Sequence, residues 1–201
     1  MFRYAADSNM KRIVLECGGK NPAVVFDDAE DLDLVAEQVV LGAFWNMGEN
    51  CSATSRLIVH ASVKDELVDR IKAYMREWRM GDPLNPANRV GALVSADHFE
   101  KVKSYIEKAA AEKLAIVEGG KTEAGAYVEP TLVDGVTPAS SLFREEVFGP
   151  VLSVTTFSTV SSGNPRRHSD GQLLRRGRHH HAVWRIQGIR IWRPGQVDLR
   201  T

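Results

Sequence analysis

Short apolar runs alternate with longer amphipathic segments over most of this 201-residue chain, and this alternation limits the folds that it can adopt. The short runs are typical of extended, mostly buried segments: 12–16, 21–26, 55–60, 115–120, 127–136 and 149–157. In the longer segments apolar residues recur every three or four positions, as in helices: 31–44, 63–78 and 95–113. The alternation predicts an α/β domain in which helices flank a layered, mostly parallel sheet.

The composition changes abruptly near residue 160. Residues 1–160 carry 17 Lys and Arg against 24 Asp and Glu, whereas residues 161–201 carry nine Arg, no Lys, two Asp and four of the six His. This change predicts a boundary between a folded body and a tail. Because the tail has little apolar periodicity, we expect it to remain largely disordered.

Several classes of protein are excluded by what the sequence lacks. No run approaches the roughly 20 apolar residues that cross a bilayer, and the first residues lack the apolar middle of a secretion signal. Two cysteines make no disulfide framework, and Cys51 has no partner at a zinc-ligand spacing. We therefore expect a cytoplasmic protein without a membrane span or a metal.

Cys51 lies in a polar, glycine-containing stretch, NMGENCSATSR (46–56), between a predicted helix and a predicted strand. A lone cysteine is most often a small core residue. The turn instead favours a thiol that faces a cleft, where backbone N–H groups can bind an oxyanion. Only the thiolate attacks, so a nucleophilic Cys51 would need a base.

Two other stretches contain candidate partners for this thiol. Glu16 stands just before Gly18 and Gly19, where a substrate or cofactor can approach the backbone closely. Glu16 is therefore either a base or an ordinary carboxylate at the end of a strand. The stretch FREEVFGP (143–150) offers two carboxylates and an aromatic ring before a strand, which suit a ribose diol and a nicotinamide. Its alternative interpretation is a turn with a core phenylalanine.

Three blocks of sequence together resemble the NAD(P)-dependent aldehyde dehydrogenase family, from about residue 2 to residue 159. They are LECGGKNPAVVFDDAEDLDLVAE (15–37), NMGENCSATSR (46–56) and REEVFGPVLSV (144–154). Their sequences are most similar to those of enzymes that oxidise aminobutyraldehyde-type substrates. Cys17 stands where the family usually has leucine, and Glu49 stands where it usually has glutamine.

The resemblance implies a role for each candidate residue. Cys51 would attack the aldehyde to form a thiohemiacetal, and its backbone N–H would supply half of an oxyanion hole. Hydride transfer to NAD or NADP would leave a thioester, which water activated by Glu16 would hydrolyse. Gly18, Glu146 and Phe148 would belong to the cofactor site. We expect Cys51 to be more reactive than Cys17, which we expect to pack inward.

The resemblance also implies an organisation into three parts. Residues 1–17 would end a cofactor-binding domain, 18–160 would form a partial catalytic domain, and 161–201 would be a tail. The family's phosphate-binding turn, an asparagine of the oxyanion hole and a cofactor lysine would lie upstream of Met1. Family members form homo-oligomers. We expect this chain to be a fragment that is inactive alone.

The arginine-rich tail has two interpretations. A basic arm with Trp184 and Trp192 suits nucleic-acid binding. Alternatively, the tail is read out of frame: tryptophan has one codon, so each Trp-Arg pair becomes a glycine after a shift of one base. The shifted reading of 179–198 then permits a glycine-rich segment that resembles the family's C-terminal signature. We therefore expect a frameshifted tail and not a nucleic-acid-binding arm.

Two functional hypotheses follow. The leading one is oxidation of a small-molecule aldehyde with NAD or NADP by the family's cysteine chemistry. The competing one is a non-enzymatic module, either a nucleic-acid-binding remnant or a partner of a separately encoded dehydrogenase half.

Overall fold

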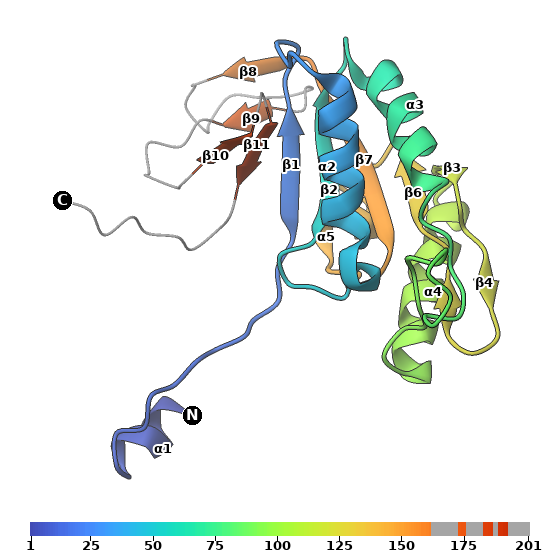
Figure 1. Cartoon of the computed structure of the whole chain (residues 1–201). Coiled ribbons are helices and arrows are strands. Elements are labelled where there is room, and N and C mark those ends of the chain that lie inside the picture. Colours follow the sequence, from blue (N-terminus) through green and yellow to red (C-terminus); the bar gives the residue numbers. More distant parts are fainter. Residues whose placement is uncertain (162–172, 176–182, 187–188, 193–201) are drawn as a thin grey trace.

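A seven-stranded sheet forms the centre of the computed structural model, which describes residues 1–161, 173–175, 183–186 and 189–192 (Figure 1). Its strand order is β10-β11-β1-β2-β7-β6-β3. The strands are, in that order, Val183–Ile186, Ile189–Trp192, Asn21–Val25, Thr54–His60, Val151–Phe157, Thr131–Asp134 and Ala115–Glu118. The four central strands, β1, β2, β7 and β6, are parallel, and the outer strands are antiparallel to their neighbours. The predicted α/β fold with a mostly parallel sheet is confirmed.

Helices cover both faces of this sheet. On one face, α2 (Leu32–Phe44) and α3 (Lys64–Met75) enclose a core with apolar side chains of β1, β2 and β7. On the other face, α4 (Ala96–Ala111) packs against β6 and β7. Consecutive residues of a strand point to opposite faces of the sheet. On β7, Leu152 lies in the first core and Val151 in the second. The result is a three-layer arrangement with the sheet in the middle.

Four smaller elements lie outside the seven-stranded sheet and its three long helices. They are the short helix α5 (Ser141–Arg144), the 3-10 turn η1 (Trp45–Gly48), the β4–β5 pair (Thr122–Glu123 with Tyr127–Val128) and the β8–β9 pair (Thr159–Ser161 with Leu173–Arg175). None of the helices among the described residues is long and apolar enough to cross a membrane.

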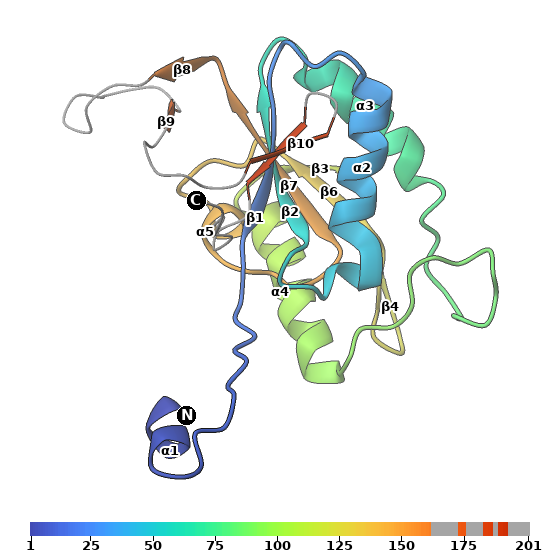
Figure 2. The ribbon, with the colours of Figure 1, turned by 60° about the vertical axis from the view of Figure 1, so that its left-hand side comes forward.

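The prediction of a buried strand at 12–16 is wrong. These residues form neither a helix nor a strand, and Val14 and Leu15 are 72% and 51% exposed. They belong to an arm that runs from the short helix α1 (Phe2–Ala6) to β1 and points away from the body (Figure 2). An apolar run becomes a strand only beside a free strand edge, and both edges of β1 are occupied, by β2 and β11.

The expectation of a largely disordered tail concerns residues that lie mostly outside the described part of the chain. Within 161–201 the structure describes the end of β8 and the strands β9, β10 and β11. Strand β11 pairs antiparallel with β1, with Ala23 opposite Ile191.

Candidate active site

Three segments that are distant in the sequence meet at the amino-terminal ends of the parallel strands. Gly18 and Gly19 precede β1, Cys51 precedes β2, and the segment 146–150 precedes β7. Because these strands are parallel neighbours, their starts lie side by side. The topology therefore brings together all three sequence blocks that contain the predicted site residues.

A tight reversal of the chain places Cys51 at these strand ends. After α2, the residues Asn46, Met47 and Gly48 all have left-handed backbone angles, with φ of 52°, 57° and 68°. A turn then closes through a hydrogen bond from the Ala53 N–H to the Asn50 carbonyl, at 3.0 Å. The Asn50 side chain stabilises this turn by accepting hydrogen bonds from the N–H and the hydroxyl of Ser52. Cys51 is thus fixed by local backbone geometry, half-buried at the start of β2.

Gly48 is the residue of this reversal that tolerates a side chain least. A Cβ atom there would overlap the carbonyl group of Gly149, and its φ is left-handed. We expect Gly48→Ala to lower the free energy of unfolding by about 3 kcal/mol, from backbone strain and overpacking together. Gly91→Ala is the matched control, since no atom lies within 4 Å of its Cβ position. Urea unfolding gives the free energy of unfolding of both variants. Equal stability of the two would contradict the close approach of Gly48 to the Gly149 carbonyl.

The start of β1 holds the Cys51 backbone from the other side. The Asn21 side chain donates a hydrogen bond to the Cys51 carbonyl oxygen at 2.7 Å. Gly19 lies so close to the same oxygen that a Cβ atom would overlap it. The Cys51 N–H, in contrast, has no acceptor among the described residues. This N–H is therefore available to an oxygen atom in the cleft.

Glu146 connects the third segment to the two glycines. Its Oε1 atom accepts a hydrogen bond from the Gly19 N–H at 2.8 Å. Its Oε2 atom faces Gly18, where a Cβ would overlap it. A side chain at position 18 would therefore require the Glu146 carboxylate to move.

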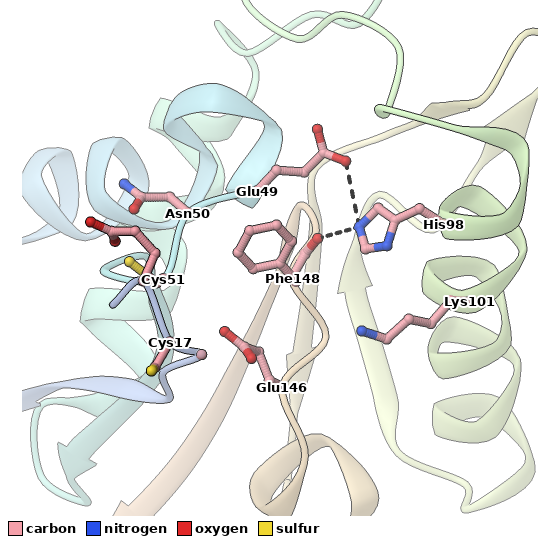
Figure 3. Close-up of a pocket in the computed structure, with 10 residues that line it drawn as sticks. Cys17, Glu49, Asn50, Cys51, His98, Lys101, Glu146 and Phe148 are labelled. Carbon is pink, nitrogen blue, oxygen red and sulfur yellow. Dashed lines mark hydrogen bonds and ion pairs between the residues drawn. The ribbon is translucent and has the colours of Figure 1, made fainter. Parts of the chain in front are cut away.

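Phe148 adopts a left-handed backbone conformation, with φ of 58°, which costs a residue with a side chain about 1–3 kcal/mol. His98, on α4, stabilises this conformation: its Nε2–H donates to the Phe148 carbonyl at 2.6 Å, and the two rings pack edge to face. An Oε1 atom of Glu49 lies 3.4 Å from the same nitrogen and also accepts from the Val94 N–H. The contacts of His98 Nε2 with Phe148 and Glu49 are drawn as dashed lines in Figure 3.

Arg56 and Tyr105 fix the chain just before Glu146. The buried Arg56 guanidinium donates to the carbonyl oxygens of Phe143, at 2.8 Å, and Glu145, at 2.7 Å. Burial lowers the pKa of Arg56 to about 10, while the nearby Glu146 opposes this shift. The Tyr105 hydroxyl donates to the Glu145 carboxylate, and burial, followed by that hydrogen bond, raises the pKa of Tyr105 to about 12. Both side chains therefore keep their protons at neutral pH.

All five residues predicted for the site line one open cleft of about 570 Å³: Glu16, Gly18, Cys51, Glu146 and Phe148. Sequence reasoning missed four other lining residues, namely Glu49, Asn50, His98 and Lys101 (Figure 3). The position of Cys17 was also predicted wrongly. It does not pack inward but is exposed in the same cleft, because the segment before β1 is not a buried strand.

No group of three or more His, Cys, Asp or Glu within the described part of the chain is arranged to hold a metal ion.

Comparison with known proteins links this cleft to one family. The model of the aldehyde dehydrogenase family matches residues 2–163. An aminoacetaldehyde dehydrogenase from Pseudomonas aeruginosa is 69% identical over 159 residues, which cover 79% of this chain and 32% of that protein.

Solved structures agree with this result. A complex of indole-3-acetaldehyde dehydrogenase with NAD+ superposes with a TM-score of 0.72 at 45% identity, covering 79% of this chain and 33% of the other. The aldehyde dehydrogenase KauB from Pseudomonas aeruginosa gives the same TM-score and coverage at 46% identity. The chain thus spans about a third of the length of the relatives that it matches.

Proposed function

Because the chain belongs to the aldehyde dehydrogenase family, we propose that it provides the thiol and nicotinamide-facing part of an enzyme that oxidises an aldehyde to a carboxylic acid. The observation that supports this most is the convergence of Cys51, the Gly18–Gly19 pair and Glu146 at the amino-terminal ends of the parallel strands. A thiol in a cleft with a free N–H beside it suits covalent attack on a carbonyl group.

Cys51 performs the covalent step. Its thiolate sulfur attacks the aldehyde carbon, and the carbonyl oxygen becomes the oxyanion of a thiohemiacetal. The Cys51 N–H, which has no acceptor among the described residues, donates to this oxyanion. The peptide unit of this N–H is held through the Asn50 carbonyl, which accepts from the Ala53 N–H, and the next peptide unit is held by the bond from Asn21 to the Cys51 carbonyl.

The residues opposite Cys51 fit the nicotinamide end of NAD or NADP. Glu146 Oε2 accepts no hydrogen bond from the described residues, so it can accept one from a ribose hydroxyl. Phe148 presents an aromatic ring to the cleft for a flat heterocycle to contact. A bound cofactor would supply the acceptor for the hydride from the thiohemiacetal carbon. The chain's own residues hold the reacting carbon in place for this transfer.

Glu16 provides the base for the second half of the reaction. It lines the cleft, is exposed, and has no hydrogen-bonding partner among the described residues, so it can take a proton from a water molecule. The hydroxide equivalent attacks the thioester carbon, the C–S bond breaks, and the thiolate of Cys51 returns with release of the acid.

A short amino aldehyde is the substrate class that we propose. The relative with 69% identity is an aminoacetaldehyde dehydrogenase. Three carboxylates line the cleft, from Glu16, Glu49 and Glu146, against one lysine, Lys101. This balance favours a substrate with a positive ammonium group over one with a second carboxylate.

The proposal also covers the organisation of the chain. Residues 1–17 would end a cofactor-binding domain and 18–160 would form part of a catalytic domain of a cytoplasmic homo-oligomer. Residues 161–201 would be a frameshifted tail; in support, the family match ends at residue 163. Resequencing the gene tests this: an unambiguous reading frame as printed, without the shifted glycine-rich signature, would contradict the frameshift.

A chimera tests the proposed chemistry. The 159 matched residues of the Pseudomonas aeruginosa relative are replaced with those of this chain. We expect the chimera to oxidise aminoacetaldehyde with NAD or NADP, measured as formation of reduced nicotinamide. Glu16→Gln in the chimera should leave the first hydride transfer intact and accumulate the thioester on Cys51, visible by mass spectrometry. A folded chimera without activity, or with activity that survives Cys51→Ala, would overturn the proposal.

A further inference from the structure

Two thiols share the cleft, although only one is needed for aldehyde chemistry. Cys17 and Cys51 are the only cysteines of the chain, both are free, and both line the same cleft. Figure 3 shows them on one wall, facing away from the side formed by His98 and Lys101. Cys17 is exposed, so a small solute reaches it directly.

The backbone holds the two cysteine segments together. Gly19, two residues after Cys17, touches the Cys51 carbonyl, and Asn21 donates a hydrogen bond to the same oxygen. Gly19 is itself tied down through Glu146. A disulfide needs Cα atoms about 4.4–6.8 Å apart. The segment on the other side of Cys17 belongs to the exposed arm and has no regular structure, so it can adjust to this spacing.

We propose that Cys17 is the resolving thiol for Cys51 and that a hydroperoxide converts the pair into a reversible disulfide. The Cys51 thiolate attacks one peroxide oxygen, the O–O bond breaks, and the products are a sulfenic acid on Cys51 and hydroxide. The Cys17 sulfur then attacks the Cys51 sulfur, the S–O bond breaks, and water leaves. Two electrons pass from the thiols to the peroxide. A small thiol reverses the reaction by exchange.

The consequence is a protected nucleophile. As a disulfide, Cys51 cannot attack an aldehyde and cannot be oxidised further to a sulfinic acid, which is not recovered by thiols. This inference goes beyond the proposed function, because it needs only that the two sulfur atoms of one cleft come within bonding distance, and no turnover.

The test uses the reduced 201-residue chain and hydrogen peroxide. At about 10 µM protein, a tethered pair with millimolar effective concentration favours the internal disulfide over the intermolecular one by on the order of a hundredfold. After alkylation of free thiols and proteolysis without reductant, we expect a linked peptide pair containing Cys17 and Cys51. In Cys17→Ser, sulfenic acid on Cys51 should persist and be trapped by dimedone. Cys17 is exposed, so this variant should fold.

A matched control moves the thiol along the same arm. Val14→Cys combined with Cys17→Ser keeps two cysteines but places one outside the cleft lining. It should give little internal disulfide. Equal yields in this variant and in the wild type, or only intermolecular dimers in the wild type, would overturn the proposal. Aldehyde oxidation by the Cys17→Ser chimera would be unaffected in either case, which separates this inference from the proposed function.

Discussion

Cys51→Ala is expected to abolish acyl transfer from 4-nitrophenyl acetate to the cleft. An activated ester needs a nucleophile and an oxyanion donor but no nicotinamide, so it tests the thiol half of the reaction alone. Removal of the nucleophile from a covalent mechanism costs on the order of 10⁶ in rate in a well-studied protease. The exposed thiol of Cys17 remains in the cleft, but it lacks the turn that fixes Cys51 beside its own N–H, so we do not expect it to replace Cys51. Nitrophenol release should therefore fall to the uncatalysed rate.

Cys17→Ala is the control for this experiment, because it removes an exposed thiol from the same cleft. We expect it to retain most of the acyl transfer, since the Cys51 N–H and its turn are unchanged. Peptide mass mapping should find the acetyl group on Cys51. Acetylation mainly of Cys17, or an unchanged rate in Cys51→Ala, would show that the turn does not activate Cys51.

Arg56→Met is expected to lower the free energy of unfolding by about 3–5 kcal/mol. Arg56 is 5% exposed, and its guanidinium donates to two main-chain carbonyl oxygens, of Phe143 and Glu145. Methionine fills a similar volume but leaves both oxygens without a donor, and each such buried group costs about 1–3 kcal/mol. Because its pKa of about 10 keeps Arg56 charged at neutral pH, the loss includes a charge-assisted interaction.

Two further variants show whether the loss of stability comes from the buried N–H groups of the Arg56 guanidinium. Arg56→Lys keeps the charge but not the planar set of N–H groups, so we expect it to recover only part of the loss. Arg70→Met removes a half-exposed arginine that pairs with the exposed carboxylates of Asp33 and Glu66, and should cost at most about 1 kcal/mol. Urea unfolding at pH 7 compares all three. A loss for Arg56→Met no larger than that for Arg70→Met would contradict the structural role of Arg56.

The sequence predicted those parts of the fold that depend on neighbouring residues. Helix α2 follows from its apolar spacing and from Asp31, whose side chain accepts from the N–H groups of Asp33 and Leu34. Ser95 begins α4 in the same way. Strands β2 and β7 were predicted within two residues of their bounds. In each case the apolar pattern of a few residues determines the element.

The parts that were missed depend on contacts between distant segments. The His98–Phe148 hydrogen bond joins residues 50 positions apart. Neither His98 nor Glu49 lies in a recognisable pattern with Phe148, and the left-handed backbone of Phe148 has no glycine to signal it. The segment 12–16 shows the opposite error: its apolar pattern is that of a strand, but it lies in the arm outside the body, and both edges of the adjoining strand β1 are occupied.

The contact between Gly19 and Glu146 has a consequence for the synthesis of the protein, because 127 positions separate the two residues. At about 5–20 residues per second, the ribosome adds Glu146 roughly 6–25 s after Gly19. Strand β7 lies between β2 and β6, so both of those strands keep an open edge until Phe157 has left the exit tunnel. During this interval the nascent chain presents the thiol of Cys51 without the cleft around it. The open edges of β2 and β6 are therefore available to chaperones until the last of the three segments arrives.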